Sequence, residues 1–214
     1  MIVPILQVQN LSFSYPGRQV FTGWSHAFGP GITWLRGSNG SGKSTLLKLL
    51  VGALPAVTGD YALNGVPMRP ETPAYRREVF WCGPGAVAFE HLLPSEFFGF
   101  MVGLYPGFDT VLAQDVADDL GLTPFMGRRL REMSTGTQRK VWLAAAFSAN
   151  TPVVLLDEPL AALDLRSMHV VRELLSHYAA DPGSAWIVVS HEDLGEAEAH
   201  PHPRMVMLPE PDAA

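Results

Sequence analysis

Cysteine is almost absent from this sequence of 214 residues, in which Cys82 is the single example. One cysteine cannot form a disulfide within the chain or build a cysteine-rich metal site. Long apolar runs are missing as well, since residues 97–108, the nearest approach to one, are interrupted by glycines and Pro106. A transmembrane helix needs about 20 apolar residues, so we expect none here. Residues 1–17 contain no Lys or Arg, so we also expect no secretory signal.

An excess of positive charge is also lacking. Lys and Arg total 15 and Asp and Glu total 21, which gives a net charge of −6. Domains that bind nucleic acid usually carry a basic face, so we expect no nucleic-acid partner. Hydrophobic residues make up 47% and charged residues 17% of the chain, a balance typical of a folded globular protein rather than a disordered one.

Apolar periodicity places strands and helices in alternation along the chain. The predicted strands are at residues 5–13, 20–28, 32–35, 153–156, 185–189 and 205–208, with shorter strands within 56–81. The predicted helices are at residues 44–52, 94–104, 109–120, 122–131, 138–150 and 165–180, with a polar helical stretch at 192–199. This alternation is typical of a mostly parallel sheet covered on both faces. Such sheets bind ligands at the carboxyl ends of their strands, so the loops after Leu35, Leu156 and Val189 should converge.

A glycine-rich loop follows the strand at 32–35 and leads into a helix. Its pattern, G-x-x-x-x-G-K-[ST], is that of the P-loop, which binds polyphosphate. The loop residues are Gly37, Ser38, Asn39, Gly40, Ser41, Gly42, Lys43, Ser44 and Thr45. Glycines let backbone N–H groups turn toward a phosphate chain, and the following helix adds the positive end of its dipole. We expect Lys43 to reach the β- and γ-phosphates and the Ser44 hydroxyl to bind Mg²⁺.

Two acidic residues, Asp157 and Glu158, end the buried strand at 153–156. Such a pair alone could equally be a solvated turn. Beside a P-loop, we expect Asp157 to hold Mg²⁺, directly or through water, and Glu158 to polarise an attacking water as a general base. His191 follows the strand at 185–189, where its imidazole could donate to the γ-phosphate and orient that water. The candidate catalytic residues are therefore Lys43, Glu158 and His191.

These motifs predict an α/β fold of the P-loop NTPase type. It should have a mostly parallel core sheet, an N-terminal antiparallel β region and an inserted helical subdomain. Residues 1–214 should form one domain, in which 1–82 and 134–214 make the nucleotide-binding core and 83–133 the helical subdomain.

The segment S-T-G-T-Q-R-K at residues 134–140 resembles the signature motif of ABC ATPases, and it precedes the acidic strand as in that family. Ala162-Leu163-Asp164 is similar to the D-loop of the family, and Tyr15 resembles the aromatic residue that stacks on adenine. The resemblance covers nearly the whole chain. Within the family, the chain most resembles the compact bacterial ATPases of ABC-2-type and haem-exporter-type systems. From the residues alone, Ser134 and Gly136 could be an ordinary helix cap, and Tyr15 could be a packed strand aromatic.

The resemblance implies an ATP-binding and ATP-hydrolysing subunit that powers an ABC-type membrane transporter, with export favoured over import. It implies ATP and Mg²⁺, and a head-to-tail dimer with a second copy or a homologous ATPase. Each ATP would lie between the P-loop of one subunit and Ser134, Gly136 and Asp164 of the other. A separate integral-membrane subunit would be the other partner. This implies a cytoplasmic protein that lies peripherally on the cytoplasmic face of the cell membrane. The apolar stretch 97–105 could pack as helix core or leave exposed residues for that subunit.

The sequence departs from the family at two places. The glutamine that usually precedes the helical region is missing, because residues 79–85 read V-F-W-C-G-P-G, and Glu90 or His91 could substitute for it. In the signature, Thr135 and Thr137 replace a glycine and a glutamine. A clamp that binds ATP with little turnover therefore stays open as an alternative. A GTPase is disfavoured because no N-K-x-D motif occurs, and a DNA-repair or translation ATPase because 214 residues leave no room for coiled-coil arms or a second cassette.

Overall fold

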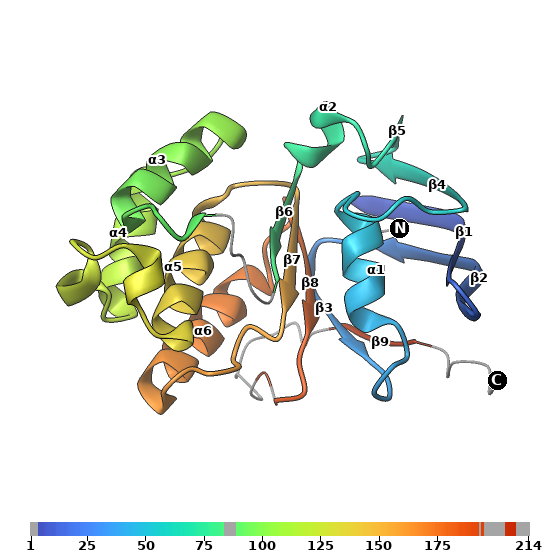
Figure 1. The fold of residues 1–214 in the computed structure, drawn as a ribbon. Coiled ribbons are helices and arrows are strands. Elements are labelled where there is room, and N and C mark those ends of the chain that lie inside the picture. Colours follow the sequence, from blue (N-terminus) through green and yellow to red (C-terminus); the bar gives the residue numbers. More distant parts are fainter. Residues whose placement is uncertain (1–3, 84–88, 193, 195–203, 209–214) are drawn as a thin grey trace.

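A computed structural model of the chain describes residues 4–83, 89–192, 194 and 204–208. Its helices lie on both sides of a parallel sheet, with α3 to α6 on one side and α1 on the other (Figure 1). A second, antiparallel sheet lies beyond α1. This arrangement confirms the predicted fold class, an α/β P-loop fold with a separate antiparallel β region.

The strands are β1 (Leu6–Tyr15), β2 (Arg18–Phe28), β3 (Gly31–Arg36), β4 (Thr58–Leu63), β5 (Val66–Met68), β6 (Val79–Cys82), β7 (Val153–Asp157), β8 (Ala185–Val189) and β9 (Arg204–Met207). The helices are α1 (Lys43–Leu50), α2 (Pro73–Arg76), α3 (Pro94–Leu104), α4 (Thr110–Asp119), α5 (Thr135–Ser148) and α6 (Leu165–Tyr178), with 3-10 turns η2 (Thr123–Phe125) and η3 (Leu130–Glu132).

The parallel sheet has the order β6-β7-β8-β3-β9. Its central strands are buried on both faces, which explains why β7 and β8 read as continuous apolar runs. Alternate residues of β7 enter different cores: Val154 and Leu156 pack with the helices α3 to α6, while Val153 and Leu155 pack with α1 and the antiparallel sheet. The registers of β3, β7 and β8 bring their carboxyl ends to one edge, so the loops after them converge as predicted.

The antiparallel sheet has the order β2-β1-β4-β5. Its first two strands are joined by Pro16-Gly17, and Gly17 adopts a φ of +76°, a left-handed conformation that glycine accepts without strain. Tyr15 and Arg18 face each other directly across this turn. Because β1 is buried on one face against α1 and β3, the turn is held against the loop that precedes α1.

Helices α3 and α4 pack on α5 through one shared apolar core. On α3, Phe97, Phe98 and Met101 are buried, while Phe100 and Leu104 remain exposed. The predicted helix at 122–131 is wrong: only the short turns η2 and η3 form there, since Pro124 and Gly127 interrupt a continuous helix. The division of the chain into core and helical subdomain stays a prediction.

Two further helices differ from the sequence-based expectation. Helix α5 begins at Thr135, three residues before the predicted start at Gln138, because Ser134 caps it. The short α2 was not predicted, and its N-cap Thr72 accepts a hydrogen bond from the Tyr75 N–H. Most of the predicted helix at 192–199 lies outside the described residues. In the described part of the chain, every helix is too short or too polar to cross a bilayer.

Candidate nucleotide-binding site

A cleft of about 380 Å³ opens at the carboxyl ends of β3, β7 and β8. Its lining comes from the β1–β2 turn, the loop after β3, the start of α1 and the ends of β7 and β8. The lining residues are Tyr15, Arg18, Val20, Asn39, Gly40, Gly42, Lys43, Ser44, Thr45, Asp157, Glu158, Val189 and His191. The three candidate catalytic residues, Lys43, Glu158 and His191, are thus brought together on one set of walls.

The loop between β3 and α1 is closely packed, which explains its glycines. Gly42 caps α1 with a φ of +95°, and a Cβ there would lie 2.7 Å from Val20 Cγ1. A Cβ on Gly37 would lie 2.5 Å from Ser41 Oγ. Ser41 is buried, and its hydroxyl has no hydrogen-bond partner among the described residues. Larger residues at either glycine would therefore open the loop.

Lys43 points back over the same loop. Its Nζ donates to the carbonyl oxygen of Gly37 at 2.7 Å and to that of Ser38 at 2.9 Å. Gly37, Ser38 and Ser41 belong to the predicted phosphate loop but are not among the residues that line the cleft. Two of them, Gly37 and Ser38, thus contact Lys43, and main-chain oxygens are the acceptors for its ammonium group among the residues that the structure describes.

Asp157, at the end of β7, is 2% exposed, and its Oδ2 has no hydrogen-bond partner within the described residues. Burial raises the pKa of this carboxyl group; the hydrogen bond from Ser44 opposes the rise, and the nearby Glu158 carboxylate adds to it. The Asp157 carbonyl oxygen accepts hydrogen bonds from Arg139 of α5 at 3.2 and 3.3 Å. A buried carboxylate oxygen without a donor, beside a serine hydroxyl, suits a hard divalent cation.

Glu158 and His191 meet just beyond the carboxyl ends of the paired strands β7 and β8. The Oε2 atom of Glu158 accepts a hydrogen bond from the His191 backbone N–H at 3.0 Å, and Oε1 lies 3.6 Å from Nε2 of the ring. Glu158 adopts a φ of +53°, an uncommon conformation for a residue with a side chain. Its own N–H donates to Val189 O at 2.8 Å, which fixes this turn. The strained turn aims the carboxylate at the imidazole.

Tyr15, the last residue of β1, lines the cleft with 39% of its surface exposed. Its ring packs edge-on against Phe13 at 4.9 Å, and its hydroxyl lies 3.4 Å from Thr45 Oγ1. The residue is therefore anchored on one side and open on the other, which leaves a ring surface available for stacking.

The signature and D-loop residues lie outside this cleft and contact each other. Ser134 Oγ caps α5 by accepting from the Thr137 N–H at 3.2 Å. A Cβ on Gly136 would lie 2.3 Å from the Ala162 carbonyl oxygen, so the two segments are in close contact. Asp164 caps α6 and forms an ion pair with Lys140 of α5 at 2.7 Å. These bonds hold the pKa of Asp164 well below its usual range, the hydrogen bond from Lys140 having the largest effect.

In the segment that lacks the expected glutamine, the side chain of Trp81 packs against Gly83. A Cβ on Gly83 would lie 2.4 Å from the Trp81 ring, so the indole fills the space in which a larger residue at 83 would begin. Glu90 and His91 do not line the cleft; the Glu90 carbonyl accepts from the Arg131 N–H at 2.9 Å, and His91 Nδ1 lies 3.1 Å from Arg131 Nη1. Neither is placed to substitute for the glutamine.

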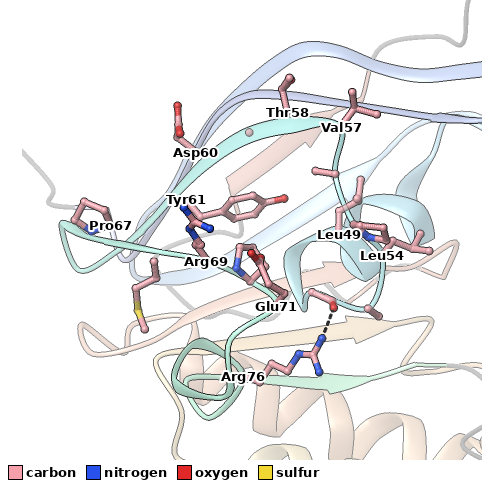
Figure 2. Close-up of a pocket in the computed structure, with 17 residues that line it drawn as sticks. Leu49, Leu54, Val57, Thr58, Asp60, Tyr61, Pro67, Arg69, Glu71 and Arg76 are labelled. Atoms are coloured by element: carbon pink, nitrogen blue, oxygen red, sulfur yellow. Dashed lines mark hydrogen bonds between the residues drawn. The ribbon is translucent and has the colours of Figure 1, made fainter.

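Sequence reasoning missed Arg18 and Val20, which line the cleft from β2. The available signal was the Pro16-Gly17 turn, which pairs Arg18 with the predicted site residue Tyr15. A larger cavity of about 870 Å³ lies elsewhere, between the end of α1 and β4, β5 and α2. Arg69, Arg76 and Glu71 stand on its rim, and none of the predicted site residues lines it (Figure 2).

Comparisons with known proteins agree with this geometry. Residues 28–161 match a family model described as ABC transporter. The cytochrome c biogenesis ATP-binding export protein CcmA of Pseudomonas savastanoi pv. phaseolicola is 30% identical over 92% of both chains. The same protein of Cupriavidus pinatubonensis is 33% identical over 88% of this chain and 84% of the relative. The phosphonates import ATP-binding protein PhnC of Trichormus variabilis is 33% identical over 81% of this chain and 75% of the relative.

Solved structures have the same fold. The ATP-binding subunit of an ABC transporter superposes with a TM-score of 0.77 at 24% identity, covering 87% of this chain and 79% of its own. A bacterial Atm1-family ABC exporter with ATP bound gives a TM-score of 0.76 at 19% identity, over 96% of this chain and 37% of that chain. The chain therefore belongs to the ABC transporter family, in which it is an ATP-binding subunit whose ATPase activity is coupled to transport.

Proposed function

We propose that the cleft between the P-loop and the ends of β7 and β8 binds Mg-ATP and hydrolyses it, and that this hydrolysis powers an exporter. The observation that carries the proposal is the meeting of Lys43, Asp157, Glu158 and His191 on the walls of one cleft. They include groups that phosphoryl transfer to water uses: a lysine for the phosphates, an acid for Mg²⁺ and a residue that positions the water.

The phosphate chain occupies the P-loop side of the cleft. Lys43 leaves the carbonyls of Gly37 and Ser38, to which it is bonded here, and turns to the β- and γ-phosphates. Backbone N–H groups of the loop and the amino end of α1 add partial positive charge. Tyr15 stacks on the adenine with its open face.

The Ser44 hydroxyl and the Asp157 carboxylate would hold Mg²⁺. Asp157 Oδ2 is buried without a donor, so a cation would satisfy an oxygen that nothing else in the described chain satisfies. Since burial raises the pKa of Asp157, a divalent ion would also stabilise its charged form. When bound, the ion neutralises charge on the phosphates.

Glu158 acts on the water. Its carboxylate orients a water molecule toward the γ-phosphorus and accepts a proton as the new P–O bond forms, while the bond to ADP breaks. His191 lies within 3.6 Å of the same carboxylate, and its side chain is 61% exposed. From that position the imidazole can donate to the γ-phosphate and stabilise charge in the transition state.

Two copies of the chain, or one copy and a homologous ATPase, close head to tail over the nucleotide. Ser134 and the amino end of α5, with Gly136, provide the second anion-binding surface, and Asp164 lies beside them through its ion pair with Lys140. Because ATP contacts both surfaces and ADP loses the γ-phosphate contact, hydrolysis lets the pair open.

The transport partner is a separate membrane subunit, which places this chain on the cytoplasmic face of the membrane. Phe100 and Leu104, four residues apart on the exposed side of α3, form an apolar surface suited to that contact. Export is supported by relatives whose names describe an ATP-binding export protein.

A Lys43→Ala variant tests the site. We expect the unchanged protein to bind Mg-ATP and release phosphate, and the variant to lose affinity by at least about tenfold, since a charge-assisted hydrogen bond contributes about 1.5–3 kcal/mol. Lys140→Ala removes a cation outside the cleft and serves as the binding control for a single subunit. Equal affinity in all three proteins would contradict the assignment, and binding without phosphate release would indicate a clamp.

A further inference from the structure

Arg18 is an exposed cation on the wall of the nucleotide cleft that the proposed site does not use. It begins β2, directly opposite Tyr15 across the Pro16-Gly17 turn. Its Nη2 donates to the carbonyl oxygen of Gly40 at 2.5 Å, in the middle of the P-loop. A two-residue turn allows little play between its ends, so Arg18 is held beside the loop by the backbone as well as by this bond.

No acid in the described part of the chain forms an ion pair with Arg18. Among the residues that the structure describes, the ion pairs involve Asp164, Glu173 and Glu158, and none includes Arg18. Lys43 is in the same situation, because within the described part of the chain its Nζ hydrogen-bonds to the carbonyls of Gly37 and Ser38 and forms no ion pair. Both cations therefore rest on main-chain oxygens of one loop, and an anion entering the cleft would be attracted by both.

The guanidinium group of Arg18 has more hydrogen-bond donors than its bond to Gly40 uses. Arginine carries five N–H groups in a planar fork, and the bond to Gly40 uses one of them. These remaining donors and the positive charge of the group can contact the oxygens of a phosphate chain. Arg18 lines the cleft together with Asn39, Gly40 and Lys43, so a polyphosphate seated on the loop would lie beside its guanidinium group.

We propose that Arg18 is a second phosphate-binding cation of this site, contacting the phosphate chain of ATP alongside Lys43. The inference rests on the proposed function, since it assigns a further contact to the same nucleotide. A competing explanation is that Arg18 only braces the P-loop through Gly40. The two differ in one respect: a brace requires a donor at the Gly40 carbonyl, whereas a phosphate contact requires positive charge.

Arg18→Gln and Arg18→Lys separate these explanations. Gln keeps an amide donor for the Gly40 carbonyl without charge, and Lys keeps the charge with fewer donors. The equilibrium dissociation constant for Mg-ATP would be measured for each folded variant at low and high salt. Arg69→Gln is the matched control, because it changes the net charge equally and lines the other cavity (Figure 2).

We expect Arg18→Gln to weaken Mg-ATP binding by about ten- to a hundredfold, the range for one charge-assisted hydrogen bond. Its affinity should also depend less steeply on salt, while Arg18→Lys recovers most of the loss and Arg69→Gln matches the unchanged protein. Wild-type affinity in Arg18→Gln, or equal losses in the Gln and Lys variants, would overturn the inference. If the unchanged protein itself fails to bind Mg-ATP, the proposed function fails and this inference with it.

Discussion

Ser134 has two possible roles that a pair of substitutions can separate. Its Oγ caps α5 by accepting from the Thr137 N–H at 3.2 Å, and the same hydroxyl is proposed to face the ATP of a second subunit. Losing an N-cap serine costs about 1 kcal/mol, which for a chain of this size lowers the melting temperature by about 2–4 °C. Ser134→Ala should therefore lose both stability and turnover.

Ser134→Asp should behave differently. Aspartate is an equally good N-cap and its charge favours the amino end of a helix, so the melting temperature should be unchanged or slightly higher. The added carboxylate would face the triphosphate, so turnover should fall at least about tenfold, as the loss of one charge-assisted hydrogen bond predicts. Phosphate release and thermal unfolding measure the two effects.

A cap in another helix provides the control. Asp109 caps α4 by accepting from the N–H groups of Val111 and Leu112 at 2.9 and 3.0 Å, and it does not line the nucleotide cleft. Asp109→Ala should lower the melting temperature by a similar amount and leave turnover intact. If Ser134→Asp turns over ATP at the wild-type rate, Ser134 is a helix cap and the signature role is refuted.

Two further variants test the packing and electrostatics of the site. Burial raises the pKa of Asp157 above its value in the unfolded chain, so the folded protein loses stability as pH rises through the folded pKa and the buried carboxyl group becomes charged. Asp157→Asn removes this charge. At neutral pH and without Mg-ATP, the variant should therefore unfold at a higher denaturant concentration than the unchanged protein. The difference should vanish at acid pH and reverse with Mg-ATP, and lower stability of the variant at every pH would contradict this reasoning. Gly83→Ala should cost about 1–3 kcal/mol of stability because its Cβ would meet the Trp81 ring at 2.4 Å. That cost should disappear in a Trp81→Ala background, and an equal cost in both backgrounds, measured by denaturant unfolding, would show that the indole is not the obstacle.

Much of the fold could be predicted because burial on both faces leaves a clear pattern. The apolar runs at β7 and β8 predicted parallel strands, and α3 has the bounds expected from its periodicity. The helix expected at 122–131 failed where Pro124 and Gly127 interrupt it. Both residues interrupt helices strongly, so the apolar pattern at 122–131 does not fold as one helix.

The candidate site was partly readable for the same reason. Strand ends that must converge in a parallel sheet brought Glu158 and His191 to Lys43. Arg18 was missed because its place depends on the pairing of β1 with β2, which a motif does not contain. The close approach of Trp81 to Gly83 depends on the direction of a side chain, which no sequence pattern records.

The central claim is that Glu158 activates water for attack on a bound ATP, and Glu158→Gln tests it most directly. At saturating Mg-ATP, steady-state phosphate release should fall by about 10²–10⁴-fold, the usual contribution of a general base. The dissociation constant for Mg-ATP should stay within about threefold of wild type, a change in binding free energy well under the roughly 1.4 kcal/mol that a tenfold change requires. Phosphate release at the wild-type rate in this variant would contradict the account.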